Sequence, residues 1–331
     1  RDRTQSLLRL NLTYTQAACI LKYTRMASDE KPGAKHHLSY LQKKPGFYLS
    51  EQAYVYELQQ AVGLRPGHRH PLTYVMEAAD DISYCLADIE DGVEKGIVTH
   101  TQLADLLKQA YAKLAESPDE LWLAPAYGTT ERRSFAAVID DCLARSAKDE
   151  FNQVHDFFVR LRVQLVHPLV DRAARGFIEN IAEIFDGSFN RAILEDDSPQ
   201  HLVMETFKSV AFDHFFSHPE VETLDLQGHH ILTSLLEHYR PLLELNQRDF
   251  QRLLASDYKG LLVESLLFRR LPNKHIRAYQ NAIQLVRENT DQCAHFNLWE
   301  MYYRCRIIQD MISGMTDQYA LHEYRVLSAL E

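Results

Sequence analysis

Residues 72–95 read LTYVMEAADDISYCLADIEDGVEK. Apolar side chains recur in this stretch at spacings of three and four, at Met76, Ala79, Ile82, Leu86, Ile89 and Val93. This spacing places side chains on one face of an α-helix. The stretch therefore predicts a long amphipathic helix from Leu72 to about Lys95, with these six side chains forming its apolar face.

The same periodicity dominates the rest of the chain. Glycine and proline number only 12 and 11 among 331 residues, and this shortage of turn-forming residues argues against a many-stranded sandwich or barrel. We expect an all-α protein with further helices at 5–24, 51–62, 99–114, 131–146, 149–166, 168–185, 199–216, 220–240, 247–256, 261–270, 273–287 and 297–327. A soft boundary near residue 117 divides the chain into regions 1–117 and 118–331 of one compact unit.

Composition excludes several classes of protein. Apolar residues make up 46% of the chain and charged residues 25%, which are globular values and exclude a disordered or collagen-like chain. No run of 18 apolar residues is present, so we expect no membrane span. The five cysteines are odd in number and form no C-x-x-C pair, which argues against a disulfide framework and predicts a cytoplasmic protein with reduced thiols.

Charge is unevenly distributed along the chain. Residues 1–44 carry nine basic and three acidic side chains, whereas the whole chain has a net charge of −10. The acidic balance argues against a non-specific nucleic-acid coat. The basic segment is either a solvated surface or an anion-binding site, and charge alone does not decide between these readings.

A second face of the 72–95 helix carries Asp80, Tyr84 and Asp88 at positions i, i+4 and i+8. Carboxylates on neighbouring turns repel one another, so such a face is either fully solvated or meets a cationic or hydrogen-bonding group. Hard oxygen ligands of this kind suit Mg²⁺ or Mn²⁺. Spacing alone leaves both readings open.

Several runs of residues resemble one known family, in order along nearly the whole chain. They are Asn11-Leu12-Thr13, Ile20-Leu21-Lys22-Tyr23-Thr24-Arg25, Lys43-Lys44-Pro45-Gly46, the run from Pro71 to Tyr84, Phe216-Ser217-His218-Pro219, Tyr239-Arg240-Pro241-Leu242-Leu243 and the run from Gln309 to Asp317. These runs are similar to the deoxyguanosine triphosphate triphosphohydrolases of the HD-domain superfamily. The resemblance implies a helical, HD-domain-like enzyme that hydrolyses a deoxynucleoside triphosphate, dGTP first of all, to the deoxynucleoside and tripolyphosphate.

The resemblance also implies roles for individual residues. Asp80 matches the last of the ligands that hold the family's divalent metal ion, Mg²⁺ or Mn²⁺. Lys22, Tyr23 and Lys44 match positions that face the phosphates, which accounts for the basic segment.

Further residues match positions that face the rest of the nucleotide. Tyr84 and Asp88 match positions that face the sugar, and Phe216 matches an aromatic residue that lies against the base. Asp225 stands where the family's glutamate is expected, and this departure makes a strict preference for guanine an open question. Family members assemble into homo-oligomers, so we expect one here.

The family's first histidine, its consecutive His-Asp pair and the catalytic residues that follow have no counterpart in this chain. His155-Asp156 has the letters of that pair, but its neighbours offer no second histidine or nearby acid, and we interpret it as coincidence. The chain begins Arg1-Asp2-Arg3, so we expect it to be the C-terminal portion of such an enzyme, unable to hydrolyse nucleotide alone. The alternatives are a catalytically inactive module for nucleotide binding or oligomerisation, and an HD hydrolase for another phosphate ester.

Overall fold

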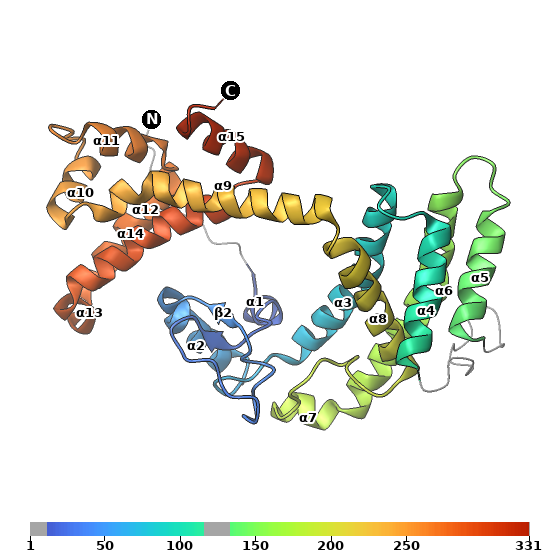
Figure 1. Ribbon diagram of the computed structural model, residues 1–331. Helices are drawn as coiled ribbons and strands as arrows, with labels where there is room; N and C mark the ends of the chain where they lie inside the picture. The colour runs from blue at the N-terminus through green and yellow to red at the C-terminus, as the bar shows by residue number, and fades with distance from the viewer. Residues whose placement is uncertain (1–11, 116–132, 331) are drawn as a thin grey trace. The chain divides into compact units, whose positions relative to one another are not determined.

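The computed structural model describes residues 12–115 and 133–330 (Figure 1). The only strands within these ranges are the short β1 (Arg25–Met26) and β2 (Pro45–Phe47), and the remaining elements are helices. The predicted all-α class is therefore confirmed. The described residues divide into two compact units, here called the N-terminal unit (12–218) and the C-terminal unit (219–330).

The N-terminal unit is built on one large apolar core. Its helices are α1 (Tyr14–Cys19), η1 (Leu49–Glu51), α2 (Gln52–Ala61), α3 (Pro71–Glu94), α4 (His100–Leu114), α5 (Phe135–Ser146), α6 (Gln153–Glu179), α7 (Ile181–Asp186), α8 (Pro199–Val210) and η2 (Ala211–Phe216). Helices α3, α4, α5, α6, α8 and η2 share the core. The expected soft boundary near residue 117 lies outside the described residues, and α4 and α5 on either side of it pack into the same core. The two compact units divide at Pro219.

Helix α3 matches the predicted 72–95 helix to within a residue. Pro71 occupies its first turn, where the missing N–H costs nothing, and the His70 ring accepts a hydrogen bond from the Leu72 N–H at 3.2 Å. Four of the six predicted apolar positions are buried. Met76 and Ala79 are not, because the buried face is instead completed by Ala78 and Cys85.

Four other predicted helices, at three places in the chain, differ from the structure. The expected 5–24 helix is represented among described residues by the short α1, which starts at a Thr13 capping box and stops before β1. The helices expected at 149–166 and 168–185 are mostly one helix, α6, which continues through the buried Pro168. The expected 297–327 helix is two helices, and Thr316 caps the second with a side-chain hydrogen bond from the Tyr319 N–H.

The two strands bring the basic N-terminal segments together. β1 and β2 pair in parallel, with Arg25 opposite Pro45 and Met26 opposite Phe47. Gly46 is required at this crossing, because a Cβ there would lie 1.7 Å from the carbonyl oxygen of Tyr23. The residues just before each strand, Lys22 and Lys43 among them, are thereby placed beside one another at the N-terminal half of α3.

The described part of the C-terminal unit has seven helices, and all of them except α13 contribute side chains to a second core (Figure 1). They are α9 (Pro219–Glu244), α10 (Gln247–Leu254), α11 (Leu262–Arg270), α12 (Asn273–Glu288), α13 (Thr290–Ala294), α14 (Phe296–Ser313) and α15 (Asp317–Leu327). The buried Arg304 pairs with Glu300 at 2.5 Å and donates to the carbonyls of Leu242, Leu243 and Leu245, which satisfies the C-terminus of α9. In the part of the chain that is described, no helix is long and apolar enough to span a membrane.

The close approach of η2 to α3 gives a stability prediction. A Cβ on Gly92 of α3 would lie 1.9 Å from the Phe215 ring, so Gly92→Ala must displace η2. We expect a loss of about 1–3 kcal/mol in the free energy of unfolding of the N-terminal unit. Gly228→Ala in α9 is the control, because nothing lies within 4 Å of its added methyl group; there we expect a gain of about 0.5–1 kcal/mol. Urea unfolding followed by circular dichroism measures both, and equal changes would contradict this account.

Candidate functional site

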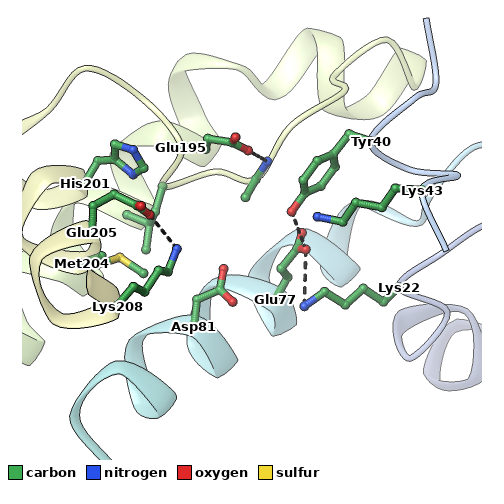
Figure 2. Close-up of a pocket in the computed structure, with 12 residues that line it drawn as sticks. Lys22, Tyr40, Lys43, Glu77, Asp81, Glu195, His201, Met204, Glu205 and Lys208 are labelled. Atoms are coloured by element: carbon green, nitrogen blue, oxygen red, sulfur yellow. Dashed lines mark hydrogen bonds and ion pairs between the residues drawn. The ribbon is translucent and has the colours of Figure 1, made fainter. Parts of the chain in front are cut away.

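A pocket of about 320 Å³ opens beside the N-terminal half of α3 (Figure 2). One side is formed by Lys22, Tyr40 and Lys43 from the segments that precede β1 and β2. The facing side is formed by α8 and the segment before it, and Glu77 and Asp81 of α3 line the pocket between them. Figure 2 shows Lys22, Tyr40 and Lys43 converging on Glu77, with Lys208 on the side of Asp81. All of these residues belong to the N-terminal unit.

Glu77 is the centre of the hydrogen-bond network. It is only 1% exposed, and the fully buried Arg69 donates to its Oε2 at 2.5 Å. The Tyr40 hydroxyl donates to Oε1 at 2.8 Å, and the Lys22 ammonium nitrogen lies 3.4 Å from the same oxygen. Arg69 also donates through Nε to the carbonyl oxygen of Lys22 at 2.8 Å, which fixes the backbone of the basic segment against α3.

Lys22 also reaches Asp80, the candidate metal ligand. Its Nζ lies 4.0 Å from Asp80 Oδ2, and the Asp80 side chain is about half exposed. Two further lysines approach the Tyr23 ring, with Lys43 Nζ 5.8 Å and Lys44 Nζ 5.9 Å from its centroid. The structure therefore pairs Lys22 with Asp80 and Tyr23 with Lys44, and of these four residues Lys22 lines the pocket.

The facing side of the pocket mixes positive and negative charge. Burial lowers the pKa of Lys208, but its 2.8 Å hydrogen bond to Glu205 and the nearby Asp81 outweigh this and raise the pKa overall. Burial raises the pKa of Asp81, with Glu77 adding to the effect and Lys22 opposing it. Burial also lowers the pKa of Lys43 on the other side. The pocket thus holds three lysines that partly compensate its carboxylates.

The sugar-facing candidates lie further along α3. Tyr84 is 61% exposed. Asp88, one turn beyond, is half-buried, and burial together with the neighbouring Asp91 raises its pKa. Phe216 is 46% exposed at the end of η2, the segment that packs on the same helix through Phe215. Asp225 is exposed on α9 of the C-terminal unit.

The described residues by themselves do not fit a metal ion. Within residues 12–115 and 133–330, no three His, Cys, Asp or Glu side chains are close enough together to hold one. Asp80 can offer carboxylate oxygens, but one carboxylate does not complete the six oxygen positions that Mg²⁺ prefers.

Sequence reasoning missed several residues of the pocket, namely Tyr40, Lys43, Glu77, Asp81 and Lys208. Glu77 and Asp81 stand in the same quoted run as Asp80, and Lys43 stands beside Lys44. These three residues could therefore have been found as neighbours of residues that the resemblance singles out. Lys208 is separated from this run by more than a hundred residues and carried no signal at all.

The fold and site define a helical protein with a lysine-lined pocket next to an exposed carboxylate face. No family model matches the chain. A protein of Pseudomonas aeruginosa named "Probable deoxyguanosinetriphosphate triphosphohydrolase" is 51% identical over 324 residues, which are 98% of this chain and 63% of that protein. Proteins named deoxyguanosinetriphosphate triphosphohydrolase from Klebsiella pneumoniae and an Enterobacter species are 45% and 44% identical, again over 98% of this chain and 62% of their own lengths.

These identities confirm the resemblance to the deoxyguanosine triphosphate triphosphohydrolase family over nearly the whole of this chain. The chain spans a little over three fifths of the length of the curated relatives it matches.

The contrast between Glu77 and Asp80 gives a second prediction. Glu77→Ala leaves the buried Arg69 without its charge partner, so we expect a loss of about 3–5 kcal/mol in the free energy of unfolding. Asp80→Ala removes a half-exposed group, and we expect a change within about 0.5 kcal/mol. Chemical unfolding of both variants measures the difference. An equal loss in the two would show that Asp80 is also part of the structural network.

Proposed function

We propose that the pocket is the triphosphate-binding part of a metal-dependent deoxynucleoside triphosphate triphosphohydrolase, with dGTP as substrate and a deoxynucleoside and tripolyphosphate as products. One observation carries this proposal: the Lys22 ammonium group lies within 4.0 Å of both Glu77 and Asp80 and lines a pocket together with Lys43 and Lys208. The names of the relatives support the substrate class.

The chemistry of the described residues follows from their charges. Lys22, Lys43 and Lys44 would neutralise the phosphate oxygens through charge-assisted hydrogen bonds. The same contacts would stabilise the charge that the departing tripolyphosphate retains. Tyr23, packed against Lys44, would hold that lysine beside the phosphates.

The rest of the nucleotide would lie along α3. Tyr84 would pack against the sugar at C2′ and reject ribose, and the Asp88 carboxylate would accept a hydrogen bond from the 3′-hydroxyl. Phe216 would lie against the base, and Asp225 would take the place of the family's glutamate, with a side chain one methylene shorter. We therefore propose dGTP as the first substrate to test and leave other deoxynucleotides as comparisons.

The metal requirement, Mg²⁺ or Mn²⁺, is proposed from the resemblance. Asp80 is the one ligand that this proposal names, and the remaining ligands would have to come from outside the described residues. We also propose a cytoplasmic homo-oligomer.

A second candidate is a catalytically inactive module that binds nucleotide. The observation in its favour is that the described residues contain no metal-binding cluster. Its lysines would bind the triphosphate without a metal, whereas the enzyme would need the metal for turnover.

Nucleotide binding and turnover separate these candidates. We expect this chain to bind dGTP weakly in calorimetry without metal, and Lys22→Ala to weaken binding about tenfold because one phosphate-facing charge is lost. Lys35→Ala is the control, since Lys35 is an exposed basic residue that does not line the pocket. Equal affinity of the wild type and Lys22→Ala would contradict the phosphate site.

Turnover is measured as tripolyphosphate released from dGTP with Mn²⁺ or Mg²⁺. We expect none from this chain, because its described residues lack a metal site. A rate comparable with that of the Pseudomonas aeruginosa relative would contradict this expectation and rule out the inactive module. In that case Asp80→Ala should abolish turnover and leave metal-free binding nearly unchanged.

A further inference from the structure

We propose that Tyr40 is a positioning residue that sets the places of two ammonium groups, those of Lys22 and Lys43, for a polyphosphate chain. This inference rests on the proposed triphosphate-binding function. Tyr40 has no assigned part in the site. Its hydroxyl nevertheless bonds Glu77, the ion-pair partner of Lys22, and its ring lies against the Lys43 ammonium group (Figure 2).

The hydroxyl end of Tyr40 acts on Lys22 through Glu77. It donates to Glu77 Oε1 at 2.8 Å, and Lys22 Nζ lies 3.4 Å from that same oxygen. Because the phenol occupies the short hydrogen-bonding position, Lys22 is held near Glu77 by charge at a longer distance. Its ammonium group therefore keeps its hydrogen-bonding capacity for an incoming anion.

The ring of Tyr40 acts on Lys43 directly. Lys43 Nζ lies 3.9 Å from the ring centroid, well inside the range of a cation–π interaction. One rigid side chain thus holds one lysine through its hydroxyl and another through its ring. The separation between the two charges is set by the length of the tyrosine.

The backbone around Tyr40 is itself held in place. The Asn190 side-chain oxygen accepts from the Tyr40 N–H at 3.0 Å and from the Leu41 N–H at 3.3 Å, and its amide donates to Ser39 at 3.0 Å. The Arg69 guanidinium carbon lies 5.5 Å from the centroid of the Tyr40 ring. A positioning residue must be fixed in this way, because any motion of its side chain would also move the groups that it holds.

Two substitutions separate the two contacts. Tyr40→Phe removes only the hydroxyl, so Lys22 takes the vacated position on Glu77 and competes with the anion. We expect sodium tripolyphosphate to bind this variant about three- to tenfold more weakly in calorimetry. Tyr40→Leu also removes the ring under Lys43, and we expect a further loss of about threefold.

Double variants test whether these losses act through the named lysines. In a Lys22→Ala background the effect of Tyr40→Phe should vanish, and in a Lys43→Ala background Tyr40→Phe and Tyr40→Leu should bind equally. Tyr56→Phe is the matched control, because Tyr56 is an exposed tyrosine of α2 outside the pocket. A Tyr40→Phe loss that persists unchanged without Lys22 would overturn the proposal.

Ligand-free NMR of lysine labelled at ¹⁵Nζ decides the proposal independently of binding. We expect Tyr40→Phe to shift the Lys22 signal and leave the Lys43 signal in place, and Tyr40→Leu to shift both. Unshifted signals in folded variants would overturn the positioning role. Failure of the wild type to bind tripolyphosphate, with the shifts present, would instead contradict the proposed function and leave the positioning role standing.

Discussion

The buried ion pair between Arg69 and Glu77 is the constraint on which the site depends. Both side chains are almost fully buried, and their nitrogen and oxygen atoms are 2.5 Å apart. The guanidinium lies 5.5 Å from the Tyr40 ring and 4.8 Å from the Tyr74 ring, and it also bonds the carbonyl of Lys22. A buried pair of this kind is tolerated only when its geometry is good and most of its polar atoms are bonded. Any other placement of the basic segment would remove the hydrogen bond from Tyr40 to Glu77 and the one from Arg69 to the Lys22 carbonyl.

The same pair determines how much positive charge the pocket offers. Glu77 would neutralise Lys22 if Lys22 were the only cation beside Glu77. Because Arg69 already compensates the Glu77 carboxylate, the Lys22 charge is only partly cancelled, and Lys43 contacts a neutral ring. Two ammonium groups in the pocket of an acidic protein of net charge −10 therefore keep much of their positive charge.

The fold was predictable because helical periodicity is a local property, and α3 starts and ends within one residue of its expected bounds. Errors arose where packing overrides local rules. Helix α6 continues through Pro168 because Leu165 and Leu169 on either side are fully buried in the core, and this burial outweighs the lost hydrogen bond. Nothing in the local sequence indicates such a balance.

The site was predictable only in part, for a similar reason. The resemblance singled out Lys22 and Asp80, of which Lys22 lines the pocket, but Tyr40 and Lys208 enter the pocket through contacts between distant segments. Glu77 was missed because the sequence presents it as one more acidic residue on a polar face. Its burial becomes visible only when the partner that compensates it, Arg69, is known to lie against it.

Glu77 and Asp80 lie within one turn of α3 but differ in burial and in bonding. They are three residues apart, about 60° around the helix, and both lie near the Lys22 ammonium group. Glu77 turns inward and is saturated by Arg69 and Tyr40, so its charge serves the fold. Asp80 turns outward and is about half exposed, with Lys22 at 4.0 Å, so its carboxylate remains accessible to solvent. The same turn of α3 thus holds one carboxylate that is bonded within the fold and one that is open to solvent.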